Sequence, residues 1–574
     1  MIRSVTAEHG SAPFLIEGAN QTRSYGEIDD LAARYAHVLQ TNGAGVDDRV
    51  LVQVDKCVEA VALYLACLRA GTVHVPLNPA FTTEELAYSI GDTEPSVVVV
   101  DPESDIASTS AGPGNSPHNR PHNSPRVLTL AAGGQGTLPG LADERETRTV
   151  RAANTAIVER QDDDLAALLY TSGTTGRPKG AALTHANLRH NALALIDTWH
   201  FTHSDRLVHC LPLFHTHGLF VALHCAMLCA IPVTFLPRFN TEQVIDALGD
   251  ATVFMGVPTH YSRLLGDPRF TAESVEHIRL FISGSAPLSE SVFAEFTERT
   301  KQRICERYGM SETGIITSNP YHGDRLPGTV GYPLPGVELR VVDNTANNVD
   351  RTVTSAESPE LAGAEPTRPQ PTRPQPVGPG VIGSVEVRGP NVFRGYWHAG
   401  KPANPDPTAN TTPANTTPAT DDNTPANTAP ATDDNTSGNT TPATDDDGWF
   451  ETGDLGSLDE GGRLSLHGRS GDLIISGGEN IYPKEVELVL DEVHGIHESA
   501  VIGLPHPDLG EAVTAVVVVD EARFSLDDAR AELATRLSRF KHPKQILIAA
   551  SLPRNAMGKV KKNTLRQQHQ QTYL

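Results

Sequence analysis

The run YTSGTTGRPKG at residues 170–180 combines glycines, hydroxyl side chains and one lysine directly after the apolar, strand-like sequence LAALLY. Glycine lets backbone N–H groups approach an anion closely, Ser and Thr add donors, and Lys179 adds a mobile positive charge. This composition favours a polyphosphate ligand, with ATP as the first candidate. The spacing differs from the pattern GxxxxGK[ST], because Gly180 stands where a Ser or Thr would hold magnesium. A flexible surface turn is the alternative interpretation.

Further segments carry side chains that a nucleotide reaction needs. Small residues at 284–286 follow an apolar strand and would let a flat base lie against the backbone. Tyr308 offers an aromatic face, and Glu312 offers a carboxylate close to it in the sequence. Asp454 in WFETGDLG could accept hydrogen bonds from ribose hydroxyls, and Lys559 follows a flexible Met-Gly pair. In isolation Glu312 and Lys559 fit a surface turn and a solvated basic tail. Their joint occurrence in this order favours a functional site.

Bulk properties exclude several classes of protein. A chain of 574 residues is too long for one core, so two or more domains are expected. Its formal net charge of −24 argues against nonspecific nucleic-acid binding and against anionic membranes. The six cysteines lack paired short spacings, which indicates a reducing compartment. No segment is apolar enough for a membrane span or a signal peptide, so we expect a soluble, cytoplasmic protein. His224, Cys225 and Cys229 are interpreted as core residues of a buried helix rather than metal ligands.

The elements that must position these side chains follow an α/β rhythm. Helical and strand-like apolar spacings alternate from Leu31 to Val75, and a compact α+β unit follows a boundary near Arg469 to Asp472. Three segments poor in apolar residues are expected to be disordered inserts: 102–126, 352–379 and 401–447. The last contains three tandem copies of a twelve-residue unit such as TPANTTPATDDN.

Together the motifs resemble those of a known family, the adenylate-forming acyl-CoA synthetases or AMP-binding family. They are YTSGTTGRPKG, ERYGMSETG, WFETGDLG, HGRSGDLIISGGENIYPKEVE and PRNAMGKVKK, in that family's order from about Tyr25 to Lys562. The resemblance implies an α/β fold with a large N-terminal domain of packed α/β sheets, a β-barrel-like subdomain, and a small mobile α+β C-terminal domain. We therefore expect the large domain at 1–469, a hinge at 470–474 and the small domain at 475–574. Gly471 stands where the family's hinge usually has Lys or Asp.

The resemblance also implies roles for matching residues. Thr171 and Glu312 would position Mg²⁺, and Lys559 would bridge the acid's carboxylate and the α-phosphate during adenylation. His215 matches a family histidine at the edge of the acyl pocket, with a packed core histidine as the alternative. The residues expected to bind ATP or coenzyme A are Thr171, Ser172, Gly173, Thr174, Thr175, Lys179, Gly284, Ser285, Ala286, Tyr308, Gly309, Asp454, Arg469, Gly477 and Gly478. A protein acetylase acting on Lys559 is a further partner to consider.

The acid is the least determined part. The stretch ITSNPYHGDRLPGTVGYPLPGV looks most like the malonate-activating branch of the family, so malonate or methylmalonate is the expected substrate. A second carboxylate needs a cation, and Arg325 is the first candidate, with Arg263 and His260 as second choices. An exposed loop arginine is the alternative for Arg325.

Other functions stay open at this point. They are a short-chain, medium-chain or aromatic acyl-CoA ligase, an enzyme that loads a separate carrier protein, a luciferase-like oxidase and a catalytically silent nucleotide-binding scaffold. The presence of both Glu312 and Lys559 argues against the scaffold.

Overall fold

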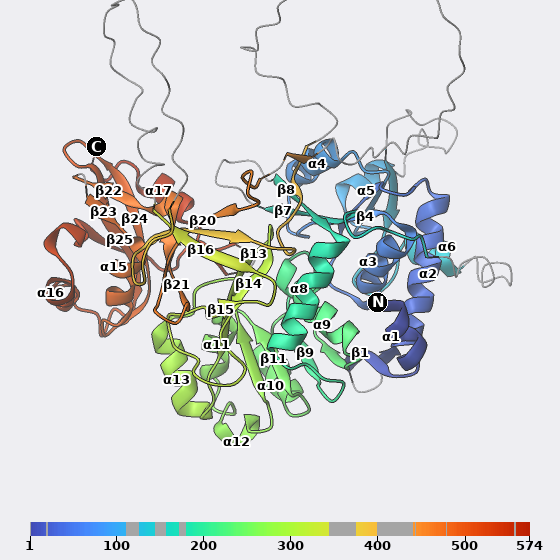
Figure 1. Cartoon of the computed structure of the whole chain (residues 1–574), viewed down its shortest axis with the longest axis horizontal. Coiled ribbons are helices and arrows are strands. Elements are labelled where there is room, and N and C mark those ends of the chain that lie inside the picture. Colours follow the sequence, from blue (N-terminus) through green and yellow to red (C-terminus); the bar gives the residue numbers. More distant parts are fainter. Residues whose placement is uncertain are drawn as a thin grey trace, which may run out of the picture.

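Figure 1 shows the structure, a computed structural model of the chain. It describes residues 2–18, 21–110, 125–143, 157–171, 179–343, 375–398, 440–441, 443–477, 479–555 and 558–573. Two large sheets with helices on their faces make up most of the molecule, and a smaller C-terminal part lies beside them. Within the described ranges, no helix combines the length and apolar character that a membrane crossing requires.

The first large sheet has eight strands in the order β19-β18-β8-β7-β4-β3-β5-β6. The neighbours from β7 to β6 run parallel, and their sequences are continuous apolar runs, as expected for a sheet that is covered on both faces. The strands are β3 (Arg49–Gln53), β4 (Val73–Pro76), β5 (Val97–Val100), β6 (Arg126–Thr129), β7 (Leu165–Thr171), β8 (Lys179–Thr184), β18 (Gly395–Trp397) and β19 (Thr440–Thr441).

Helices connect and cover these strands. A capping box between Ser24 and Glu27 starts the first long helix, and a left-handed glycine, Gly71, ends the next one. The helices before the phosphate loop are α1 (Ile2–His9), α2 (Tyr25–Thr41), α3 (Val58–Ala70), α4 (Thr83–Thr93), α5 (Asp105–Ser110) and α6 (Thr137–Asp143). The crossovers α3 and α4 make the parallel pairing of β3, β4 and β5 possible.

The second large sheet has nine strands in the order β15-β14-β13-β12-β11-β9-β10-β1-β2. The strands from β13 to β1 are parallel, so the carboxyl ends of β9, β11, β12 and β13 meet at one edge. In open α/β sheets this edge is where ligands bind. The strands are β1 (Pro13–Gly18), β2 (Gln21–Ser24), β9 (Leu207–His209), β10 (Val233–Phe235), β11 (Val253–Gly256), β12 (Leu280–Ser283), β13 (Cys305–Met310), β14 (Gly314–Ser318) and β15 (Tyr332–Pro333).

The helices of this sheet include one π-helical segment, η1, directly before α9. Both are buried, and His224 and Cys225 lie in α9 as predicted core residues, with the Tyr64 hydroxyl 2.8 Å from His224 Nε2. The bounds are α8 (His185–Thr198), η1 (His217–Ala222), α9 (Leu223–Leu228), α10 (Thr241–Leu248), α11 (Pro258–Leu265), α12 (Ala272–Val275) and α13 (Glu290–Thr300).

Two smaller sheets complete the molecule. One is a four-stranded antiparallel sheet, β16-β17-β20-β21, at the place in the chain where a barrel-like subdomain was predicted. A bridge between Gly331 and Leu464 joins this sheet to the nine-stranded sheet. Its strands are β16 (Glu338–Val342), β17 (Gly383–Arg388), β20 (Phe450–Leu458) and β21 (Leu464–Arg469). The C-terminal elements are η4 (Ser470–Asp472), β22 (Ile474–Ser476), β23 (Glu479–Ile481), α15 (Pro483–Asp491), β24 (Ile496–His506), β25 (Gly510–Val519), α16 (Leu526–Arg536), η5 (Arg539–Lys541), β26 (Gln545–Ile548) and α17 (Lys562–His569).

The C-terminal elements have hydrophobic clusters of their own. Ile474, Val501, Val513 and Leu533 belong to one cluster, which contains no residue from the large sheets. In Figure 1 these elements, orange to red, lie beside β20 and β21. The small α+β unit predicted from the sequence is therefore present, beginning near Ile474.

The predicted inserts need correction at their edges. Residues 105–110 form α5 and Arg126 opens β6, so the first insert is shorter than predicted. Pro376 bridges Val342 at the end of the second segment, and β19 and residues 443–447 are described within the third. The remaining parts, 111–124, 352–374, 401–439 and residue 442, lie outside the described residues.

Candidate active site

The predicted phosphate loop connects two antiparallel strands. Thr171 ends β7 and pairs in register with Lys179, which opens β8. Residues 172–178, which include Ser172, Gly173, Thr174 and Thr175, lie outside the described residues. Lys179 Nζ lies 5.3 Å from the centroid of the Tyr396 ring. The hairpin thus brings the lysine to β18.

Glu312 contacts the same tyrosine. Its side chain is only 6% exposed, and the Tyr396 hydroxyl donates a hydrogen bond of 3.0 Å to Oε1. Burial raises the pKa of this carboxyl, while the hydrogen bond and the charge of Arg469 oppose the rise. Lys179 and Glu312, far apart in the sequence, therefore meet around one aromatic ring.

Tyr308, Asp454 and Arg469 form a second cluster, as the sequence indicated. The Tyr308 hydroxyl donates to Asp454 Oδ2 at 2.5 Å, and Arg469 Nε lies 2.7 Å from Asp454 Oδ1. Asp454 and Arg469 are direct cross-strand neighbours on β20 and β21. Burial alone would lower the pKa of the Arg469 guanidinium, but Asp454 and its neighbours raise it overall. The carboxylate is held in a fixed orientation beside an aromatic ring.

Two glycines here are required by close packing. A Cβ at Gly309 would lie 2.1 Å from the carbonyl oxygen of Gly314, because β13 and β14 have a bulge at this point. A Cβ at Gly284 would lie 2.4 Å from Arg307 Cζ, so the guanidinium packs directly on the Gly284 backbone. The absence of a side chain at Gly284 thus makes room for Arg307, in addition to the nucleotide base predicted to lie near residues 284–286.

Lys559 lies in the C-terminal part of the chain, shortly before α17. A Cβ at Gly558 would lie 3.4 Å from Thr259 Oγ1 at the start of α11, so the lysine loop contacts the large sheet region. Loss of hydration lowers the pKa of the Lys559 amine and the charge of Arg469 lowers it further, while Asp454 opposes both. The Lys559 amine is therefore within electrostatic reach of both Arg469 and Asp454.

Gly477 follows β22 directly. Gly477 has a left-handed φ of +59°, and its N–H donates to the Leu509 carbonyl at 2.9 Å. Gly478 lies outside the described residues.

A cluster of buried cationic and imidazole groups lies next to Gly284. Arg307 is 4% exposed, and its Nη2 lies 3.4 Å from the hydroxyl of Ser285, a residue with a left-handed φ of +71°. His217 Nδ1 lies 3.3 Å from the same hydroxyl. Burial and the Arg307 charge lower the pKa of His215 to about 4, so this imidazole is neutral at pH 7. Burial lowers the pKa of Arg307 to about 10, so it stays charged.

Arg307 has unused hydrogen-bonding capacity. Its Nε is buried and has no hydrogen-bond partner among the residues that the structure describes. A buried cationic donor without a partner is unfavourable unless a ligand satisfies it. This group is the strongest candidate for an anion-binding position on the acyl side.

Arg325, the predicted partner of a second carboxylate, is placed differently. Its guanidinium donates to the carbonyls of Pro320, Arg303 and Tyr321 at 3.1, 2.8 and 2.9 Å. Arg303 precedes β13, so Arg325 lies at the amino end of the strand whose other end carries Tyr308. The structure corrects this assignment, because Arg325 fastens a loop at the far end of the sheet.

The second choices lie nearer the site. His260 stacks on Phe239 with ring centroids 4.1 Å apart and lines a cavity of about 420 Å³. Burial lowers the pKa of His260 to about 3. Arg263 is exposed on α11, with its guanidinium 5.9 Å from the Phe239 centroid. The large cavity is also lined by residues 54–56, 78–80, 210–214 and 237–239.

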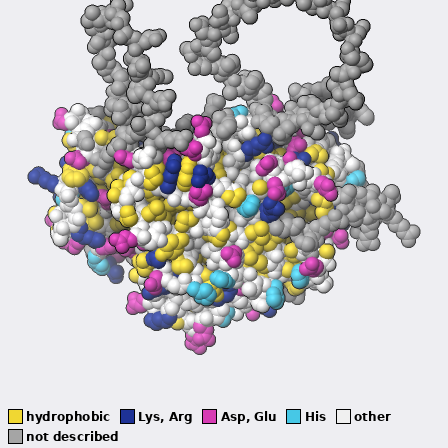
Figure 2. All heavy atoms as spheres, viewed as in Figure 1, with side chains coloured by type: hydrophobic (Ala, Val, Ile, Leu, Met, Phe, Trp, Pro, Cys, Tyr) yellow, Lys and Arg dark blue, Asp and Glu magenta, His cyan; other side chains and the backbone are white. Residues whose placement is uncertain are grey.

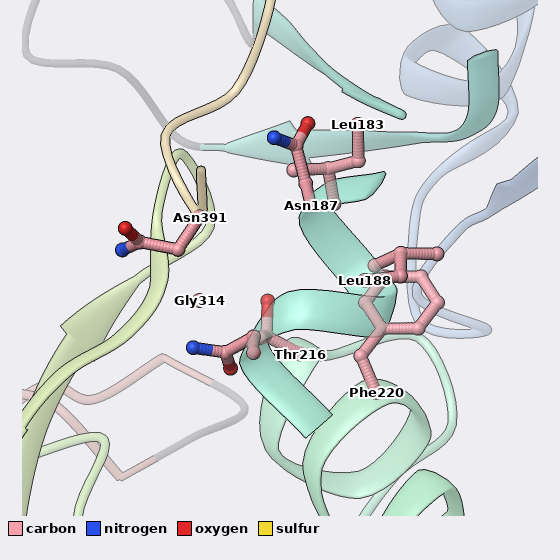
Figure 3. A pocket seen from close by; sticks show the side chains of 8 residues that line it. Leu183, Asn187, Leu188, Thr216, Phe220, Gly314 and Asn391 are labelled. Atoms are coloured by element: carbon pink, nitrogen blue, oxygen red, sulfur yellow. The ribbon is translucent and has the colours of Figure 1, made fainter. Parts of the chain in front are cut away.

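A much smaller cavity lies behind η1 and is shown in Figure 3. Thr216 and Phe220 approach it from one side, and Asn391 and Gly314 from the other. Its volume is about 10 Å³, which is room for about one water molecule. It is too small for any organic acid, so the acid must bind elsewhere.

Sequence reasoning missed Arg307 and His217. Arg307 lies within ERYGMSETG, directly before Tyr308, and a charged residue inside a buried strand was the available signal. His217 follows His215 in the segment PLFHTHG, where a second histidine was equally visible.

Comparisons with known proteins place the chain in a family. Residues 2–357 match the family described as AMP-binding enzyme, and residues 485–559 match the AMP-binding enzyme C-terminal domain. The mitochondrial malonate–CoA ligase ACSF3 of Bos taurus is 33% identical over 547 residues, covering 90% of this chain and 81% of that protein. A feruloyl-CoA synthase of an Amycolatopsis species is 30% identical over 552 residues, covering 95% and 93%. For some curated relatives the chain spans under two thirds of their length, 62% in one case.

A solved structure is similar over the whole chain. The crystal structure of ATP-bound MatB from Rhodopseudomonas palustris is 40% identical, covers 100% of this chain and 99% of its own, and has a TM-score of 0.81. These comparisons give no support to a protein acetylase as a partner, and the mitochondrial relative leaves the cytoplasmic location a prediction.

On the face drawn in Figure 2, basic side chains are scattered among acidic and apolar ones.

Proposed function

The chain belongs to the AMP-binding enzyme family, and from this premise we propose that it is an AMP-forming acid–CoA ligase that activates malonate or methylmalonate. The choice of acid rests on Arg307, whose buried Nε has no partner among the described residues. A distal carboxylate would pair with this guanidinium, whereas an alkyl chain or an aromatic ring would leave it unpaired. The similarity to malonate–CoA ligases supports the same acid.

The nucleotide would be held by the Tyr308 cluster. Tyr308 offers its ring to adenine, and Asp454, oriented by Tyr308 and Arg469, accepts hydrogen bonds from the ribose hydroxyls. The Tyr308 hydroxyl and the Arg469 guanidinium would together hold the Asp454 carboxylate in place. This arrangement would fix the α-phosphate relative to Lys559.

The phosphates would lie between Lys179 and Glu312. Mg²⁺ is commonly held by one or two carboxylates together with substrate phosphates, so the single buried carboxylate of Glu312 fits that metal. Mg²⁺ bound there would offset negative charge on the β- and γ-phosphates. The Tyr396 hydroxyl orients the Glu312 carboxylate, and Lys179 supplies a further positive charge.

Lys559 would act on the reacting atoms in the first step. A carboxylate oxygen of the acid attacks the α-phosphorus, the bond from the α-phosphorus to the bridging oxygen breaks, and pyrophosphate leaves. The Lys559 ammonium stabilises the charge shared by the carboxylate and the α-phosphate as this bond forms. The product is an acyl-adenylate, in which AMP is a good leaving group.

The second step would use the thiol of coenzyme A. The sulfur attacks the acyl carbon, the bond from that carbon to the AMP oxygen breaks, and the thiol proton is lost to solvent. The cavity of about 420 Å³ next to His260 is large enough for a thiol-bearing arm. We propose, as the family resemblance implies, that rotation about residues 470–474 withdraws Lys559 and brings the turn at Ser476–Glu479 to this side.

A panel of acids tests the proposal. Purified protein is incubated with ATP, Mg²⁺, coenzyme A and one of malonate, methylmalonate, acetate, octanoate, benzoate or ferulate. Pyrophosphate release and mass spectrometry of the thioester are measured. We expect malonate or methylmalonate to give the highest kcat/KM. A preference for ferulate or benzoate would favour an aromatic acyl-CoA ligase instead, a function that the Amycolatopsis relative makes the main alternative.

A further inference from the structure

Lys56 is a largely buried lysine on the wall of the cavity of about 420 Å³, and the mechanism above gives its amine no role. It follows β3 of the eight-stranded sheet and reaches across to the nine-stranded sheet. Its Nζ lies 2.9 Å from the His209 carbonyl, 2.6 Å from the Leu236 carbonyl and 2.7 Å from His209 Nδ1. The amine also lies 4.3 Å from the Phe235 ring centroid. All three N–H donors of an ammonium are therefore matched with acceptors.

These contacts determine the tautomer of His209. The Gly218 carbonyl, which can only accept, lies 2.9 Å from His209 Nε2, so the ring proton lies on Nε2. Nδ1 of His209 therefore accepts from the Lys56 amine. His209 is fully buried, and its pKa lies well below its ordinary value because of burial and the charge of Lys56. The ring is thus a fixed neutral link between Lys56 and Gly218.

Gly218 connects this link to the acid-binding cluster. It is the second residue of η1, and its carbonyl also accepts from the Leu223 N–H in the wide π-helical turn. A Cβ at Gly218 would lie 2.0 Å from the Pro212 carbonyl oxygen, so no side chain fits here and Gly218 packs closely against Pro212. The preceding residue, His217, lies 3.3 Å from the Ser285 hydroxyl that Arg307 also contacts.

We propose that Lys56 is a positioning residue for the acid-binding cluster, acting through His209 and the Gly218 carbonyl to hold His217 and Ser285 beside Arg307. This inference rests on the proposed function, since it assigns a purpose to the Arg307 cluster. The chain has a lysine at position 56 rather than an apolar side chain of similar length, although burying the lysine charge is unfavourable. Burial lowers the pKa of Lys56 to about 7, which shows how strongly the site disfavours the charge.

A purely structural role, fastening one sheet to the other, is the competing explanation. The sheet contacts of Lys56 are its bonds to the His209 and Leu236 carbonyls, and the link to η1 is its bond to the His209 ring. The two roles can therefore be separated, because His209→Phe removes the ring link and keeps both carbonyls. Arg49 offers a matched control: it also extends from β3 and donates to the Thr93 and Glu94 carbonyls, both at 2.8 Å.

The experiment compares Lys56→Met, His209→Phe, their double variant and Arg49→Met in the full-length protein. KM and kcat are measured for ATP and for the acid of the panel that the wild type activates fastest. Both single variants should raise the KM of the acid roughly tenfold or more, with the KM of ATP unchanged, because misplacement of binding groups by about 1 Å is enough for such losses. The double variant should lose no more than the larger single loss. Arg49→Met should lower the melting temperature without changing the KM of the acid.

Crystal structures of the two single variants provide a readout that needs no activity. Movement of the His217 ring away from the Ser285 hydroxyl supports the inference, and an unmoved ring overturns it. An unchanged KM of the acid in a folded His209→Phe protein also overturns it. Failure of the wild type to use malonate would overturn only the proposed acid. The role of Lys56 would still be tested, because KM is measured with whichever acid the wild type activates and the crystal structures report the position of His217.

Discussion

Arg307→Met is the most direct test of the proposed acid. The guanidinium is 4% exposed, so a malonate carboxylate bound to it would be almost completely removed from water. Breaking a buried ion pair by removing one partner costs about 3–5 kcal/mol, and each 1.4 kcal/mol is a factor of ten. The substitution with methionine also removes a buried unpaired donor from the free enzyme, which is favourable. The expected loss of binding free energy is therefore about 3 kcal/mol, the lower end of this range. We therefore expect kcat/KM for malonate to fall roughly a hundredfold.

The assay measures malonate-dependent pyrophosphate release over a range of malonate and ATP concentrations. Propionate, which has a methyl group in place of the second carboxylate of malonate, is the control substrate and should be used no worse by the variant than by the wild type. The KM of ATP should stay unchanged, since Arg307 contacts no residue of the Asp454 cluster in the described hydrogen bonds. A folded Arg307→Met protein with unchanged kcat/KM for malonate would refute the reasoning.

Other predictions concern the nucleotide side and acid stability. Lys559→Gln should reduce pyrophosphate exchange by about two to four orders of magnitude and leave thioester formation from a supplied acyl-adenylate nearly unchanged, whereas equal loss in both half-reactions would contradict its assigned step. Tyr308→Phe removes the donor to Asp454 and should raise the KM of ATP about tenfold, measured at saturating acid; an unchanged KM would show that the hydrogen bond does not orient Asp454 for ribose. Burial lowers the pKa of His224 to about 4, below its unfolded value of about 6.5, so its contribution to stability is complete above pH 6.5 and is lost as the pH falls toward 4. Urea unfolding of His224→Gln and wild type between pH 7 and 4 should therefore show a smaller acid loss in the variant, and parallel curves would disprove it.

The residues assigned to the nucleotide side could all be selected from motifs in the sequence. Lys179, Glu312, Asp454 and Lys559 are each tied to short sequences with special composition, and the α/β rhythm follows from local apolar spacing. The structure brings Lys179 and Glu312 to Tyr396. Such residues can be found from sequence because their local sequence is itself unusual.

The acyl side could not be predicted in the same way. Arg325 and Arg307 are both arginines near the same motif, and the choice between them depends on which end of β13 each one faces. The end of the strand that a residue faces depends on sheet register and on crossover connections, and local sequence patterns do not determine either. Likewise, apolar spacing over 217–228 cannot distinguish a π-helical turn followed by a helix from one continuous helix.

The contact between Gly558 and Thr259 has a consequence for how the chain can be divided. The lysine loop belongs to a unit with hydrophobic clusters of its own, yet its docking surface is supplied by the start of α11. Severing the polypeptide between β21 and β22 would therefore leave two pieces whose cores are each complete but whose reactive groups are in different molecules. Reassociation of the two fragments, monitored by recovery of adenylation, would then report the affinity of that docking surface directly.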